Sequence, residues 1–210
     1  MNIIDNIIEI KKNTPNATLV VVTKYQKLSD ISIAYECGER DFGENKVQEI
    51  LKKKVELPND IKWHMIGHLQ KNKVKLIAPF IHMIQSVDSV DLLKIINKQA
   101  KVNNRKIKCL IQYKIAKEKE KYGLNKSDII KLFTSGLIKE YQNIEIKGLM
   151  GMASLTTNIK DIESEFQDIK NLSSQLKIKL KTLSIGMSND YKTAYQNGST
   201  MIRIGSAIFK

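Results

Sequence analysis

Short apolar runs alternate with stretches of helical spacing along almost the whole chain. After an amphipathic stretch at residues 1–13, the apolar runs have the length and the β-branched content that favour strands. The stretches between them carry apolar residues three and four positions apart, which predicts helices. The predicted strands are residues 17–23, 40–42, 61–66, 81–85, 107–113, 144–150, 182–186 and 200–204, and the predicted helices are 29–37, 44–55, 71–79, 89–102, 126–139, 159–178 and 190–197.

A repeated order of strand and helix with eight strands predicts an α/β protein built as a closed, parallel (β/α)8 barrel, or TIM barrel. A doubly wound open sheet is the alternative. No G-x-G-x-x-G fingerprint and no G-x-x-x-x-G-K-S/T motif follows any strand, and this favours the barrel. Because no linker or fixed-period repeat interrupts the pattern, we expect a single domain spanning residues 1–210.

Composition places the chain among ordinary globular proteins, with 42% apolar and 27% charged residues. The first 13 residues mix charged and apolar positions, so they predict a helix and not a signal peptide. No apolar stretch approaches the length needed to span a bilayer, so we expect no membrane association. Cys37 and Cys109 lie far apart in apolar contexts, which predicts buried, reduced thiols and a cytoplasmic location.

A net charge of +13 raises the question of a nucleic-acid partner. The lysines are scattered, and no helix-turn-helix, zinc-finger or aromatic RNA-binding signature is present, so we expect no nucleic-acid function. The mixed-charge segment at residues 117–123 is typical of a solvated loop.

Lys24 directly follows the apolar run at residues 19–23. A lysine at the end of a strand often extends its amine to water, and this ordinary explanation remains open. In a barrel, however, the carboxyl ends of the strands carry the chemistry. Burial at such a position would favour the neutral, nucleophilic amine.

Two glycine- and serine-containing segments close the chain. IGMSND (185–190) follows the seventh predicted strand, and Gly205 and Ser206 follow the eighth, at the start of a short helix. Glycine lets an anion approach the backbone, serine donates a hydroxyl, and helix N-termini favour anions, so this pair predicts a phosphate site, although the glycines could simply turn the chain. Arg203 lies two residues earlier and can only donate hydrogen bonds, whether to a ligand or in an ion pair. A lysine, a phosphate site and a fixed donor on one face favour a phosphorylated aldehyde as the cofactor.

The chain resembles the pyridoxal phosphate homeostasis proteins, which are related in fold to the N-terminal barrel domain of alanine racemase. Eight ordered blocks carry the resemblance over nearly the full length: VVTK (21–24), FGENKVQE (42–49), WHMIGHLQKNK (63–73), IQSVDS (84–89), KYGL (121–124), GLMGM (148–152), LSIGMSND (183–190) and GSTMIRIGSAIF (198–209).

This resemblance implies that pyridoxal 5'-phosphate (PLP) is bound covalently, as a Schiff base, to Lys24. It places Ser188, together with Gly205 and Ser206, at the phosphate, Arg203 opposite the pyridine nitrogen and Asn45 near the ring. The chain departs from the family at one point, because many members continue as TKP after the lysine whereas Tyr25 stands here. A role carried by a second lysine two residues on is therefore in doubt.

Whether the protein is an enzyme or a carrier depends on the ring nitrogen. Catalysis that uses the ring as an electron sink works best with an acidic partner there, and Arg203 is the opposite. Racemases of related fold also add a second domain, and this chain ends four residues after Ser206. We therefore expect a monomeric, non-catalytic PLP carrier that acts in PLP homeostasis and has apo PLP-dependent enzymes as recipients; a racemase-type enzyme of weak activity is the alternative.

Other residues are assigned structural roles. His64 and His68 are four apart, but they straddle a strand end and have no third ligand nearby, so we expect no metal site. Ser188 and His68 lack the G-x-S-x-G elbow of a hydrolase. Met65, Met83, Met150 and Met152 are expected in the barrel interior or at its upper rim, and Trp63 in the core.

Overall fold

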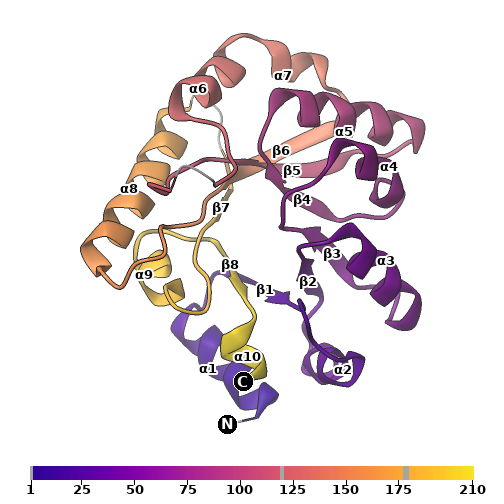
Figure 1. The fold of residues 1–210 in the computed structure, drawn as a ribbon, viewed down its shortest axis with the longest axis vertical. Helices are drawn as coiled ribbons and strands as arrows, with labels where there is room; N and C mark the ends of the chain where they lie inside the picture. Colours follow the sequence, from indigo (N-terminus) through magenta and orange to yellow (C-terminus); the bar gives the residue numbers. More distant parts are fainter. Residues whose placement is uncertain (1, 119–120, 177–179) are drawn as a thin grey trace.

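The protein is a closed barrel of parallel strands surrounded by helices (Figure 1). This computed structural model describes residues 2–118, 121–176 and 180–210. In that part of the chain the strands follow one another around the barrel in sequence order. They are β1 (Thr18–Val22), β2 (Asp41–Glu44), β3 (Lys62–Met65), β4 (Met83–Val87), β5 (Ile107–Gln112), β6 (Ile144–Met150), β7 (Thr182–Ser184) and β8 (Met201–Ile204).

Pairing between the first and last strands closes the barrel. Thr18 is in register with Met201 of β8, and Val21 with Ile204. An open sheet would leave both strands as edges, so this pairing excludes the doubly wound alternative and confirms the predicted TIM barrel. The N-terminal and C-terminal helices also lie side by side (Figure 1), and the side-chain amide Nδ2 of Asn6 donates to the carbonyl of Ile208 at 2.9 Å.

A helix is present at each predicted position, with bounds that differ by up to three residues and with a changed form in two places. The helices are α1 (Ile3–Asn13), α2 (Leu28–Glu36), α3 (Val47–Glu56), η1 (Lys71–Lys73), α4 (Val74–Ile77), α5 (Val90–Val102), α6 (Lys126–Thr134), α7 (Leu137–Glu140), α8 (Ile159–Gln175), α9 (Tyr191–Gln196) and α10 (Ser206–Phe209). The helix predicted at 126–139 is wrong as one piece, because Gly136 adopts φ +80° and separates α6 from α7. The helix predicted at 71–79 begins as a 3₁₀ turn.

Strand bounds agree to within two residues, with one consequence for the site. The strands predicted at 40–42 and 81–85 extend to Glu44 and Val87, so Gly43, Glu44, Ser86 and Val87 belong to strands and not to the loops after them. Residues 177–178 of the helix predicted at 159–178, residues 119–120 of the mixed-charge loop and residue 1 lie outside the described residues.

Two apolar layers surround the strands. The inner cluster consists of Val20, Met83, Leu110, Met150 and Met201, with Met152 packed against it. The outer cluster joins the strands to the helices. Trp63 is buried there, as predicted. Met65, the last residue of β3, packs in the outer cluster, so of the two places predicted for it, the interior and the upper rim, the interior is wrong. It neighbours inward-facing His64 along β3, and successive side chains point to opposite faces.

Two further predictions concern solvent and membranes. Cys109 is fully buried, and burial raises the pKa of its thiol. Cys37 is only partly buried, so the predicted burial is right for Cys109 alone. In the described part of the chain, no helix combines the length and apolarity that crossing a membrane requires.

Candidate cofactor-binding site

A cavity of about 900 Å³ opens at the carboxyl ends of the strands. It is lined by residues that follow β1, β2, β3, β5, β6, β7 and β8, so distant segments converge there because parallel strands end on the same face. The predicted site residues that line it are Lys24, Asn45, Ser188, Arg203, Gly205 and Ser206. The structure therefore brings all six predicted residues to one cavity.

Lys24 lies in a tight turn directly after β1. The amide of Gln26 donates to the carbonyl of Thr23 at 3.0 Å, and Tyr25 adopts φ +66°, a left-handed conformation that is costly for a residue with a Cβ. The Lys24 side chain is exposed, with its Nζ 5.1 Å from the centre of the Tyr25 ring. The expected burial of this amine is therefore wrong, because the turn carries the side chain out over the open face of the cavity.

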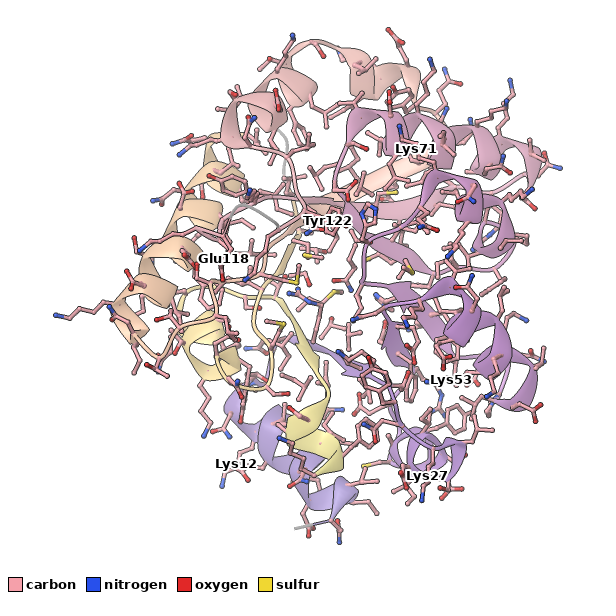
Figure 2. The ribbon with its side chains drawn as sticks, viewed as in Figure 1. Lys12, Lys27, Lys53, Lys71, Glu118 and Tyr122 are labelled. Carbon is pink, nitrogen blue, oxygen red and sulfur yellow. The ribbon has the colours of Figure 1, made fainter. Side chains whose placement is uncertain are left out.

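A buried ion pair supports this turn from behind. Lys53 of α3 (Figure 2) is paired with Glu44 of β2, and both side chains are at most 5% exposed. The Lys53 ammonium also donates to the carbonyl of Thr23 at 2.8 Å, and the Thr23 hydroxyl donates to Glu44 at 2.6 Å. The residue before Lys24 is thus held through its backbone and its side chain, and nothing in the spacing of the sequence indicated this contact.

Close backbone packing fixes the loop that carries Asn45. A Cβ on Gly67 would lie 2.4 Å from the carbonyl oxygen of Asn45, a distance that no side chain could tolerate. Gly67 after β3 therefore allows the loop after β2 to approach it closely. Asn45 is half-buried at the cavity wall as a result.

Ser188 connects the loops that follow β7 and β8. Its hydroxyl oxygen accepts a hydrogen bond from the amide of Ala207 at 3.2 Å. Gly205 packs so closely on β1 that an added Cβ would lie 3.1 Å from the Val22 carbonyl oxygen. Asp190 lies in the same wall; its carboxylate accepts from the amide of Met187 at 2.6 Å, and burial raises its pKa. The two loops thus meet as predicted.

Arg203 is 4% exposed and reaches the floor of the cavity from β8. Its guanidinium donates to the carbonyl and hydroxyl oxygens of Ser184, at 2.7 and 2.6 Å, and to the carbonyl of Gly151 at 2.8 Å. Burial lowers its pKa to about 10, partly offset by Asp190, so the group stays protonated at neutral pH. The surface ion pair considered from sequence is thereby excluded.

An aromatic pair forms another part of the wall. Tyr122, which Figure 2 labels, stacks on His68 with ring centres 3.9 Å apart. His68 Nδ1 lies 2.7 Å from an Asp88 carboxylate oxygen. Tyr122 belongs to the segment predicted as a solvated loop, and it is a loop residue whose side chain is exposed, although one face of its ring contacts His68. Its position in the KYGL block was the sequence signal that could have marked Tyr122 as a site residue. The block did not indicate that the ring would stack on His68 at the cavity.

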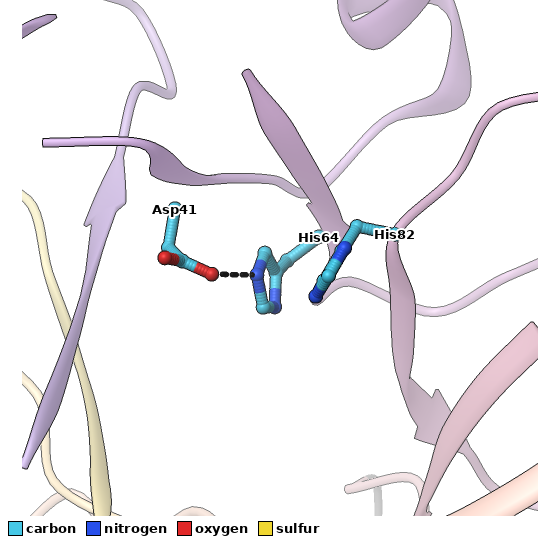
Figure 3. A group of neighbouring side chains, drawn as sticks. All are labelled: Asp41, His64 and His82. Atoms are coloured by element: carbon cyan, nitrogen blue, oxygen red, sulfur yellow. Dashed lines mark hydrogen bonds and ion pairs between the residues drawn. The ribbon is translucent and has the colours of Figure 1, made fainter. Parts of the chain in front are cut away.

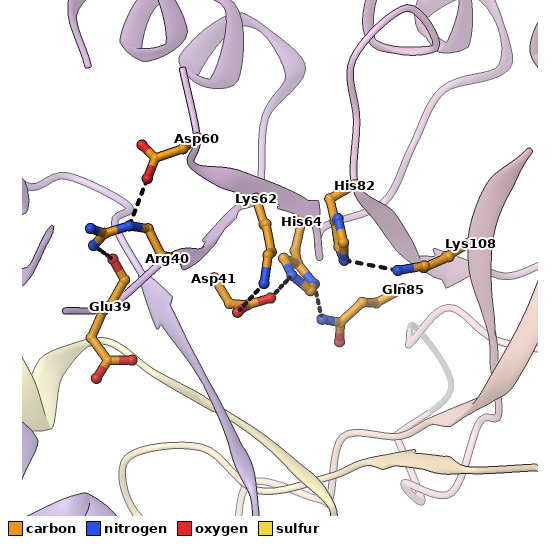
Figure 4. Close-up of polar contacts among 9 residues, drawn as sticks. All are labelled: Glu39, Arg40, Asp41, Asp60, Lys62, His64, His82, Gln85 and Lys108. Atoms are coloured by element: carbon orange, nitrogen blue, oxygen red, sulfur yellow. Dashed lines mark hydrogen bonds and ion pairs between the residues drawn. The ribbon is translucent and has the colours of Figure 1, made fainter. Parts of the chain in front are cut away.

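A second polar cluster lies at the other end of the barrel, where the strands begin. Asp41, His64 and His82 each offer one oxygen or nitrogen atom of the kind that coordinates metals, and these atoms lie within 4.8 Å of one another (Figure 3). Lys62 Nζ is 3.9 Å from Asp41, and Lys108 Nζ is 3.4 Å from His82 (Figure 4). Burial, with the charge of Lys108, lowers the pKa of His82 to about 4. The positive charges of Lys62 and Lys108 lie beside these atoms and disfavour the binding of a divalent cation by electrostatic repulsion.

His64 and His68 do not share a site. His64 faces Asp41 inside the barrel, whereas His68 lies at the cavity beside Asp88. His64 lies in β3 and His68 in the loop that follows it, so the four-residue spacing runs along extended backbone and does not bring the two rings together. The expected absence of a metal stays a prediction.

Comparisons with known proteins agree with this architecture. Residues 1–210 match the family model described as alanine racemase, N-terminal domain. A pyridoxal phosphate homeostasis protein from Schizosaccharomyces pombe is 32% identical, covering 100% of this chain and 90% of the relative. The human protein of that name is 38% identical, covering 91% of this chain and 75% of the relative. This chain belongs to the pyridoxal phosphate homeostasis protein family.

Solved structures of this family and of its racemase relatives share the fold. PipY from Synechococcus elongatus without PLP superposes with a TM-score of 0.94 and 30% identity over the whole of both chains. The PLP-bound form of PipY gives 0.90 and 29%, also over the whole of both chains. Alanine racemase from Bartonella henselae gives 0.77 at 18% identity, with 98% of this chain and 57% of the racemase covered, which shows a shared fold alone.

Proposed function

We propose that this protein binds PLP through a Schiff base to Lys24 and takes part in intracellular PLP homeostasis as a carrier. One observation carries the proposal: the six residues predicted from separate strand ends line the same cavity. The names of the relatives and the PLP-bound structure of PipY support it. The cytoplasm as location, the monomeric state and apo PLP-dependent enzymes as recipients are parts of the same proposal.

The cavity fits the phosphate and the aldehyde of PLP. Its volume of about 900 Å³ is in the range of small-molecule sites. Ser188 and Ser206 offer hydroxyl donors, and Gly205 leaves space where a Cβ would crowd the backbone. Lys24 is the amine at the rim of the same cavity. When bound, PLP supplies an aldehyde that reacts with a primary amine with loss of water.

Arg203 determines how the ring is held. Its guanidinium can only donate, so an unprotonated pyridine nitrogen is the partner that it favours. Three fixed contacts to backbone and side-chain oxygens keep it in place before any ligand arrives. Asn45 supplies a polar group at the cavity wall.

A carrier role follows from two features of these residues. An arginine at the ring nitrogen leaves the ring a weak electron sink, which disfavours chemistry through a carbanion. The exposed side chain of Lys24 lets other amines reach the cofactor, which favours exchange. A racemase-type activity is the second candidate, because Tyr122 lines the cavity with Lys24 and could supply a second acid or base.

The test begins with the visible spectrum of the purified, PLP-loaded protein, followed by borohydride reduction and peptide mapping. The modified peptide should contain residue 24. Lys24→Ala should lose the absorbance of the Schiff base, whereas Lys27→Ala, a change at an exposed lysine that does not line the cavity, should keep it.

Transfer of PLP to an apo-enzyme is then measured beside racemase, decarboxylase and transaminase assays. Transfer without amino-acid turnover is the expected result. Modification of a peptide lacking residue 24 would contradict the site, and substantial turnover that is lost in Tyr122→Phe would favour the racemase candidate.

A further inference from the structure

A chain of hydrogen bonds runs through the barrel interior from the cavity to the far end. Arg203 Nη1 donates to Ser184 Oγ at 2.6 Å, and Ser184 Oγ donates to Gln85 Oε1 at 2.7 Å. Gln85 Nε2 lies 2.9 Å from His64 Nδ1, and His64 Nε2 lies 2.9 Å from Asp41 Oδ1. Figure 4 shows the far half of this chain.

The donors and acceptors fit one direction only. Arg203 has no acceptor, so the Ser184 oxygen accepts from it and the Ser184 hydrogen points to Gln85. Because Oε1 of Gln85 accepts that hydrogen, its Nε2 must donate to His64. Nδ1 of His64 then has no hydrogen, and Nε2 carries the one that it donates to Asp41. A cation at the cavity is thereby linked to a carboxylate at the other end.

The location of these residues is unusual for a barrel. Interiors of this fold are filled mainly by branched apolar side chains, yet His64, Gln85 and Ser184 are fully buried. A buried polar group without a partner is costly, so each residue depends on the next for its hydrogen bond. A change at one end therefore alters the hydrogen bonding of the residues that follow.

Asp41 terminates the chain close to solvent. Its side chain is 21% exposed; burial raises its pKa, but the hydrogen bond from His64 and the charge of Lys62 oppose burial and the pKa is lowered overall. The groups that face it and His64 are Lys62, His82 and, beyond them, Lys108. The Asp41 end of the hydrogen-bond chain is thus accessible to solvent, whereas the Arg203 end lies in the cavity wall.

We propose that Asp41, His64, Gln85 and Ser184 are positioning residues for the Arg203 guanidinium, so that a change at the far end of the barrel alters how the cavity holds the ring of PLP. The inference rests on the proposed function, in which Arg203 faces the pyridine nitrogen. It adds a second region, at the opposite end of the barrel, to the determinants of PLP binding.

Loss of Asp41 should propagate stepwise. Without this acceptor, His64 can take the tautomer with hydrogen on Nδ1, which faces the donor Nε2 of Gln85. The Gln85 amide then rotates, and Ser184 loses its acceptor. The contacts of Arg203 to the carbonyls of Ser184 and Gly151 remain, so the effect is a graded loss of affinity, about 2- to 30-fold.

The decisive comparison is Asp41→Ala with Asp60→Ala. Asp60 precedes β3 at the same end of the barrel and carries the same charge. It pairs with Arg40 and takes no part in the chain of hydrogen bonds that leads to Arg203. For both variants we measure the PLP dissociation constant, the absorbance maximum at saturating PLP and the pH at which that absorbance changes. Asp41→Ala should shift all three, and Asp60→Ala should match the wild type.

Two changes at Gln85 test the middle of the chain. Gln85→Glu keeps the shape but turns a donor into an acceptor, and Gln85→Leu removes both groups; each should shift the same spectrum. Met83→Leu, in the inner apolar cluster of the same strand, is the matched control. If the Gln85 variants do not fold, the comparison of Asp41→Ala with Asp60→Ala alone tests the positioning role, because Asp41 is partly exposed.

The outcomes separate the two proposals. A wild-type protein that binds no PLP would overturn both. A wild type that binds PLP, with affinity and spectra in Asp41→Ala that equal those of Asp60→Ala, would overturn the positioning role and leave the proposed function standing.

Discussion

Lys53 donates a hydrogen bond of 2.8 Å to the carbonyl oxygen of Thr23, the residue that precedes Lys24. The same ammonium is paired with Glu44 inside the protein. A helix outside the barrel therefore holds the backbone from which the proposed Schiff-base lysine projects, and it does so with a charge that is buried and paired in the folded state.

Lys53→Met should lower the free energy of unfolding by about 3–5 kcal/mol, because it leaves the Glu44 carboxylate buried without its cation. One oxygen of Glu44 already has no partner among the described residues. Urea denaturation of the apoprotein measures the effect. The double change Glu44→Leu with Lys53→Met should recover much of the loss, and Lys52→Met, at an exposed neighbour, should change little. Equal midpoints for Lys53→Met and Lys52→Met would refute the role of the ion pair.

Tyr25→Pro should destabilise the turn that carries Lys24. Proline holds φ near −65°, whereas Tyr25 adopts +66°. We expect a loss of more than about 1 kcal/mol and slower reaction of Lys24 with PLP. Tyr25→Gly, which accepts the left-handed conformation, is the matched comparison. If the proline variant reacts and unfolds like the glycine variant, the turn has no such constraint.

The stability of the protein should decrease as the pH falls from about 6.5 to about 4. Burial is the largest cause that lowers the pKa of His82 from 6.5 to about 4, and the charge of Lys108 adds to it. In this window the unfolded chain binds the proton and the folded chain does not, so acid favours unfolding. With allowance for partial exposure, His82 contributes about 1–2 kcal/mol of the change.

Urea midpoints at pH 7 and pH 5 measure this dependence. His82→Gln should flatten it, whereas His68→Gln, at the other end of the barrel, should retain it. A His82→Gln variant that keeps the full pH dependence would show that another group is responsible.

Ser188→Ala should weaken the binding of PLP by about 5- to 30-fold while leaving the binding of pyridoxal, which has no phosphate, nearly unchanged. The loss corresponds to about 1–2 kcal/mol for one hydrogen bond to a charged group. Equilibrium titration followed by fluorescence measures both ligands. Ser174→Ala, at an exposed position of α8, is the control. A parallel loss for both ligands would show that Ser188 supports the loop through Ala207 and does not bind phosphate.

Much of the fold follows from local pattern. The alternation of apolar runs and helical spacing places all eight strands, because side-chain period is a local property of strand and helix. The ends of those strands then predict which residues share a face, and Lys24, Ser188 and Gly205 do line one cavity. The break at Gly136 was less evident, since an isolated glycine in a helical pattern is often tolerated.

The sequence by itself determined the strand order of the barrel and the chemical groups at its carboxyl end, since both depend on short-range spacing and on the rule that parallel strands end together. Only the tertiary structure decided that Lys24 is exposed, that Lys53 supports its turn and that Asp41 is linked to Arg203 across 162 positions of sequence. Such contacts depend on closure and register, which bring side chains from different strands within hydrogen-bond distance, and no local period of the chain encodes that distance.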